Sequence, residues 1–175
     1  MAGEKVFTTS ASLLYVSLGG LTKVQFGFLS AGSWIFHLLG LLICWKISKK
    51  VSLKTMFHTG LFLFILSSIL LLIAVVFNIE SLVFLYIAIL ILMFATGFIL
   101  CASAVGIVKP FPSLIALSTA LAMGIEFLLS FVASFIVSHF SSKEILPVSF
   151  SIAILGILSL CIWFIFLKNE LKKPS

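Results

Sequence analysis

The chain has 175 residues, of which 62% are hydrophobic and only 9% are charged, and its formal net charge is +6. Soluble domains carry roughly 25% charged residues, so this composition excludes an ordinary soluble enzyme or binding domain. The mean hydropathy of +1.37 indicates a membrane protein instead. The positive charge then predicts lysines beside a lipid bilayer rather than a nucleic-acid partner.

Six apolar segments follow one another along the chain. Four uncharged runs of 22 to 28 residues exceed the roughly 20 residues that a helix needs to cross a bilayer. A fifth run is interrupted only by Glu126, and a shorter first run covers 17 residues. We predict an all-α integral membrane fold in one domain, 1–168, with a tail at 169–175. Its six transmembrane helices are expected at about 6–19, 26–45, 53–77, 81–108, 113–140 and 145–167.

The placement of the lysines predicts the orientation of these spans. If the N-terminus is cytoplasmic, nine lysines lie on the inside, and two, Lys23 and Lys143, lie outside. Cytoplasmic loops carry the excess of basic residues in membrane proteins. We therefore expect a multi-pass protein with both termini in the cytoplasm.

Several short motifs follow one another along these spans. The link between the second and third spans runs from Gly40 through a basic loop with Lys46, Lys49 and Lys50. The other motifs are Ala11-Ser12, Gln25-Phe26-Gly27, Gly97, Pro110-Phe111-Pro112 and Ser118-Thr119-Ala120-Leu121. From about Val6 to Leu167 this order resembles the major facilitator superfamily, and most closely its branch of bicyclomycin and chloramphenicol exporters.

The resemblance covers only the C-terminal six-helix half of such a transporter, which implies two inverted three-helix repeats. It implies proton-coupled efflux of small amphipathic drugs by alternating access, in the bacterial inner membrane. In such a transporter the substrate site lies between two six-helix halves. The second half would be a separately encoded N-terminal half or a second copy of the chain. Because only one half is matched, a degraded or split gene is expected. The alternative is a non-transporting membrane fragment or assembly component.

The chain also departs from the family pattern. Cys44 stands where the family has an asparagine, and Lys46, Lys49 and Lys50 stand where it has arginines, which weakens the expected cytoplasmic gate. Ser113-Leu114 replaces a Gly–Arg pair, and a glutamine is common in the family where Glu126 occurs here.

Glu126 is the sole acid inside a predicted span, and burying its charge costs several kcal/mol unless it faces protein or water. At 100° per residue it shares one helix face with Thr119, Ala122, Ser130 and Ala133. This face is a candidate site for substrate or protons; the other interpretation is a neutral or hydrogen-bonded acid in place of a glutamine. A second face, with Ala116, Ala120 and Gly124, is expected to pack closely against another helix.

Two further residues, His37 and Trp34, are candidates for the cavity wall, although packing is the simpler role for the tryptophan. The three histidines are scattered without ligand spacing, so no metal site or cofactor is expected. No Gly-x-Ser-x-Gly elbow or carboxylate pair indicates an enzyme. Cys44, Cys101 and Cys161 are interpreted as small apolar packing residues.

Overall fold

The computed structural model describes residues 20–77, 79, 81–108, 113–140, 154, 157 and 158. The predicted spans at 6–19 and 145–167 and the tail at 169–175 lie outside the described part, apart from those last three isolated residues. Four long helices make up the described part: α2 (Lys23–Ile47), α3 (Leu53–Val76), α4 (Leu82–Val108) and α5 (Ile115–Phe140). Each is long and apolar enough to cross a membrane. The fold is therefore all-α over these residues, as predicted, and consistent with a multi-pass membrane protein.

The observed helix ends differ by up to three residues from the predicted spans, and polar side chains cap the starts of α2 and α3. The hydroxyl of Thr22 accepts a hydrogen bond from the Gln25 N–H, and the Gln25 side chain accepts one from the Thr22 N–H. This reciprocal capping box starts α2 at Lys23, three residues before the predicted start. Ser52 caps α3 in a similar way, because its hydroxyl accepts from the Thr55 N–H at 3.2 Å.

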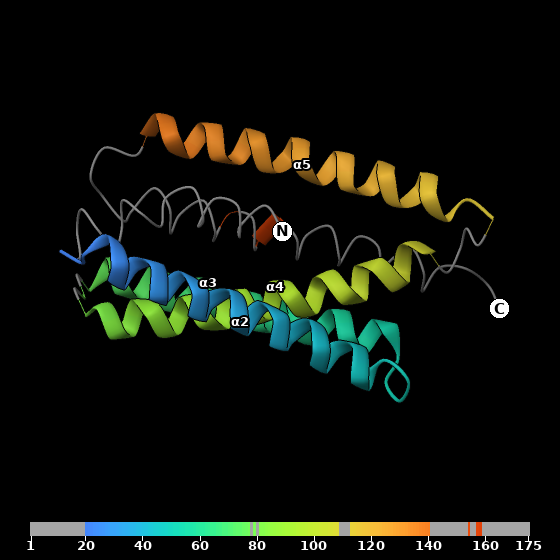
Figure 1. Ribbon diagram of the computed structural model, residues 1–175, viewed down its shortest axis with the longest axis horizontal. Helices are drawn as coiled ribbons and strands as arrows, with labels where there is room; N and C mark the ends of the chain where they lie inside the picture. Colours follow the sequence, from blue (N-terminus) through green and yellow to red (C-terminus); the bar gives the residue numbers. More distant parts are fainter. Residues whose placement is uncertain are drawn as a thin grey trace.

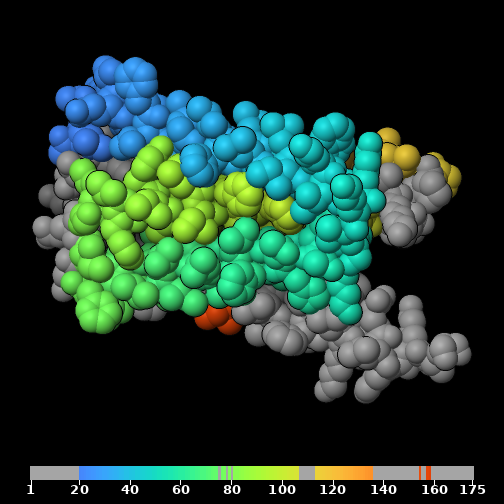
Figure 2. Space-filling view, turned by 90° about the horizontal axis from the view of Figure 1, so that it is seen from below, coloured from blue at the N-terminus to red at the C-terminus, as the bar shows by residue number. Residues whose placement is uncertain are grey.

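Helix α4 lies in the middle of the bundle and packs against both α2 and α3. Figure 2 shows it as a yellow-green strip between α2 in blue and α3 in green. Hydrogen bonds from Ser67 to Ala88 and from Tyr86 to Leu29 fix both neighbours. Gly60 lies against Ile99 whereas Ser67 lies against Ala88, so α3 runs antiparallel to α4. Leu29 pairs with Tyr86 and His37 with Thr96, so α2 runs parallel to α4.

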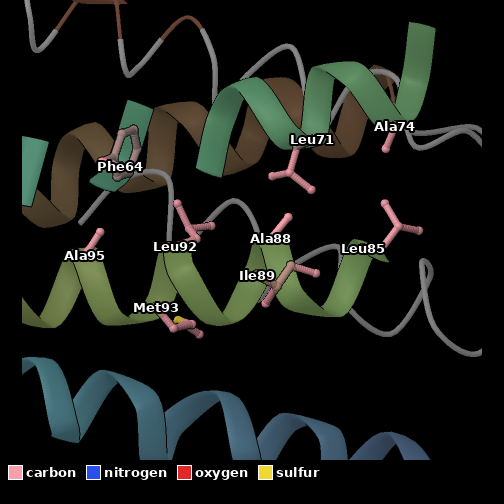
Figure 3. Packing of buried hydrophobic residues seen from close by; sticks show 9 residues of the cluster. All are labelled: Phe64, Leu71, Ala74, Leu85, Ala88, Ile89, Leu92, Met93 and Ala95. Atoms are coloured by element: carbon pink, nitrogen blue, oxygen red, sulfur yellow. The ribbon is translucent and has the colours of Figure 1, made fainter. Parts of the chain in front are cut away.

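The core between α3 and α4 is built from two facing rows of apolar side chains (Figure 3). Phe64, Leu71 and Ala74 of α3 point toward α4, where the facing side chains are spaced three or four residues apart. Met93 instead turns toward α2 (Figure 3). The whole cluster comprises Phe64, Leu71, Ala74, Leu85, Ala88, Ile89, Leu92, Met93 and Ala95.

Helix α5 contacts α4 less extensively and is set apart from the other three helices over most of its length (Figure 1). Most of its apolar side chains are exposed, as are many on the outer face of α2. In water such a surface would drive aggregation, whereas lipid tails solvate it.

Candidate functional site

His37 and Thr96 form a buried hydrogen bond between α2 and α4. Nδ1 of His37 lies 3.2 Å from Oγ1 of Thr96, and both side chains are almost completely shielded. The Thr96 hydroxyl donates its one proton to the Met93 carbonyl at 2.9 Å. Because a hydroxyl has a single hydrogen, Oγ1 is left to accept from His37, which assigns the donating proton to Nδ1 of the imidazole ring.

Two glycines bring the backbones of α2 and α4 close together at this point. A Cβ atom on Gly97 would collide with the His37 carbonyl oxygen, and one on Gly40 would collide with the Phe94 carbonyl oxygen. Small residues at a helix crossing allow this approach. The resulting van der Waals contact stabilises helix packing in lipid, where the hydrophobic effect contributes little between helices. Gly40 is thus a buried packing residue within α2.

Trp34 lies next to His37, with ring centroids 5.5 Å apart and an angle of 67° between the rings. Its side chain is 40% exposed at the outer side of α2, whereas His37 is 5% exposed. The structure therefore brings these two candidates together, with the histidine engaged by α4 and the tryptophan accessible from outside.

The other candidates share one side of α5. Thr119, Ala122 and Glu126 are half-buried, and Ser130, one turn further, is buried. The hydroxyl oxygen of Ser130 is shielded and has no hydrogen-bond partner in the part of the chain that the structure describes. A buried hydroxyl without a partner costs about 1–3 kcal/mol, which distinguishes Ser130 from the hydroxyls that bond within their own helix.

The small-residue face of α5 is not used for packing within the described bundle, which differs from the prediction. Ala116, Ala120 and Gly124 are exposed, and a Cβ atom on Gly124 would meet nothing within 4 Å. The physical reason is that the face with Glu126 and Ser130 is the one turned inward. Burial of the polar face leaves the small residues on the outside.

The basic residues of the predicted gate lie at the end of α2 and in the following turn. Lys46 is in the last helical turn, and Lys49 and Lys50 are in the link to α3; all three are exposed. A cation in the last turn interacts favourably with the helix dipole. This placement is compatible with lysines at the membrane–water interface. Their role in a cytoplasmic gate stays a prediction.

Sequence reasoning missed several polar contacts between helices. The Ser67 hydroxyl donates to the Ala88 carbonyl at 2.8 Å, and the Tyr86 hydroxyl donates to the Leu29 carbonyl at 3.1 Å. Thr96 was also not identified, although its position next to Gly97 was a usable signal. Among the described residues, no cluster of three or more histidine, cysteine or acidic side chains could hold a metal ion.

Comparisons of the chain with family models, curated proteins and solved structures find no match. Over the described residues, the fold defines a helical bundle with four candidate membrane spans. The resemblance to the major facilitator superfamily stays a prediction.

Proposed function

We propose that this chain is one bundle of a secondary-active transporter that exports small amphipathic cations in exchange for protons. The proposal combines the order of motifs along the sequence with the arrangement on α5. The observation that carries it is the buried hydroxyl of Ser130, which has no hydrogen-bond partner among the described residues and lies one helical turn from Glu126 in a candidate membrane span.

Glu126 gives this site its chemistry. An acid inside a membrane span is costly and generally faces protein or a water-filled cavity, where it marks an ion or substrate pathway. A single carboxylate can bind a proton or a cationic drug, but binding one opposes binding the other. This competition is the basis for an exchange of protons against drug.

A second bundle is needed for alternating access, because the substrate site of such carriers lies between two bundles that rock against each other. The exposed apolar side chains of α5 are compatible with such a partner. We propose a separately encoded six-helix half, or a second copy of this chain, as that bundle. The bacterial inner membrane, with both termini cytoplasmic, is the proposed location.

Binding of tetraphenylphosphonium to the full chain in lipid nanodiscs tests this proposal. We expect saturable binding that weakens on acidification, since protonation removes the charge of Glu126. Glu126→Gln should weaken binding about tenfold or more, equivalent to about 1.4 kcal/mol. Ser118→Ala is the matched control, because that hydroxyl already donates to the Ile115 carbonyl within α5.

Unchanged affinity in Glu126→Gln would contradict the assigned site. Absence of saturable binding in a folded wild-type protein would favour the alternative, a membrane component that does not transport. Helicity measured by circular dichroism distinguishes this outcome from unfolding.

A further inference from the structure

Cys44 and Cys101 face each other across the interface between α2 and α4. Cys44 is completely buried in a cluster with Met56, Phe98 and Ala102, and Cys101 packs against the same cluster. The two thiols therefore belong to one cluster at the same level of the α2–α4 interface. Both cysteines are free thiols, and Cys101 is the partly exposed member of the pair.

The register of the two helices accounts for this meeting. The Tyr86 hydroxyl bonds to Leu29, 57 positions earlier, and Thr96 bonds to His37, 59 positions earlier. The separation of the two cysteines is 101 − 44 = 57, so they fall in the register that these hydrogen bonds fix. Cys44 also follows Gly40 by one turn, and Cys101 follows Gly97 by one turn, on the same two faces.

The distance between the helix backbones is also suitable for a covalent link. A disulfide requires Cβ atoms roughly 3.5–4.5 Å apart, which is shorter than most helix packings allow. At Gly40 and Gly97, each backbone approaches the other as closely as glycine permits. One turn further along, the short cysteine side chains therefore reach each other.

We propose that Cys44 and Cys101 form a reversible disulfide that joins α2 to α4 when the membrane contains lipid-soluble hydroperoxides. The partly exposed Cys101 sulfur attacks the peroxide oxygen, which breaks the O–O bond and gives a sulfenic acid and an alcohol. The Cys44 sulfur then attacks the Cys101 sulfur, the S–S bond forms, and the oxygen leaves as water with the Cys44 proton. The two thiols lose two electrons, and the peroxide gains them.

The buried position of Cys44 assigns it the second step. A thiol with no exposed surface is not open to a bulky peroxide, whereas it shares one packed cluster with Cys101, on which the sulfenic acid forms. The resulting bond ties two helices that are otherwise held by hydrogen bonds and packing, so the oxidised bundle should resist unfolding.

The full chain carrying Cys161→Ser, which removes the third thiol, is the protein for the test. It is treated in nanodiscs with tert-butyl hydroperoxide, and intact mass and reactive thiols are measured after denaturation. We expect a loss of two hydrogen atoms, loss of both thiols from labelling with maleimide-polyethylene glycol, and a higher melting temperature than that of the reduced protein. Dithiothreitol should reverse all three changes.

Two single-thiol controls separate the steps. With Cys44→Ser added, Cys101 should accumulate as a sulfenic acid that dimedone traps. With Cys101→Ser added, Cys44 should stay reduced. The proposal would be overturned if the protein with both cysteines stays helical but keeps two labelled thiols, or if it forms disulfides only between molecules.

Discussion

His37 donates from Nδ1 to Oγ1 of Thr96 over 3.2 Å, directly beside the point where Gly97 brings the two helix backbones together. The contact combines the two forces that hold helices in lipid, close packing of small residues and hydrogen bonding between helices. It fixes α2 against the central helix α4. The two α2 candidates from the sequence therefore have a structural position that is distinct from the acid-bearing face of α5.

Replacing Thr96 by valine should destabilise the bundle by about 1–2 kcal/mol, because the His37 N–H loses its acceptor in a buried position. Thr96→Ser keeps the hydroxyl and should retain most of the stability. Thermal or denaturant unfolding in detergent measures both variants. Equal stability of Thr96→Val and the wild type would show that the hydrogen bond contributes nothing.

An alanine at Gly97 should cost about 1–3 kcal/mol or prevent folding, because the added methyl group meets the backbone of His37. Gly124 in α5 provides the matched control. Its Cβ position is open, so Gly124→Ala should leave stability unchanged or raise it by up to about 1 kcal/mol through helix propensity. The reverse order of the two melting temperatures would contradict the assigned α2–α4 crossing.

Ser67 and Ser68 offer a comparison between adjacent buried hydroxyls. Ser67 donates to Ala88 on α4, whereas Ser68 donates to the Phe64 carbonyl within its own helix. Ser67→Ala should lower the free energy of unfolding by about 0.5–1.5 kcal/mol, and Ser68→Ala by less, since a bond within the helix adds little. Unfolding titrations measure the free energy of unfolding of both variants. A larger loss in Ser68→Ala than in Ser67→Ala would contradict this pairing of α3 with α4.

The positions of the four described helices were predictable from the sequence because charges are excluded from lipid. The predicted spans at 53–77 and 81–108 match α3 and α4 to within a residue at each end, and capping by Thr22 and Gln25 explains the earlier start of α2. The spans at 6–19 and 145–167 lie outside the described residues and stay predictions.

The side of each helix that faces its neighbours was harder to predict. Membrane helices are apolar all round, so hydrophobic periodicity does not separate lipid-facing from buried sides. On α5 the small residues suggested a packing face, yet Ala120 and Gly124 are exposed, and Ser130 is buried instead. The meeting of Cys44 with Cys101 depends on the register of α2 and α4, which no local pattern encodes.

If the proposed second bundle is a separately encoded half, the chain expressed alone should give no drug resistance, because one bundle would supply only one wall of a transport cavity. Minimum inhibitory concentrations for several cationic and neutral drugs in an efflux-deficient bacterial host measure this. Reproducible resistance that disappears in Glu126→Gln would contradict a separately encoded second half. It would indicate that two copies of the chain form the transporter.

The central claim is that the chain crosses the bilayer repeatedly, with its lysine-rich link after α2 in the cytoplasm. Single cysteines at Lys49 and Lys143, in a background without other cysteines, test it with a membrane-impermeant maleimide on intact cells. We predict that position 143 is labelled from outside and that position 49 reacts only after the membrane is permeabilised. Labelling of position 49 in intact cells, with position 143 protected, would contradict the account.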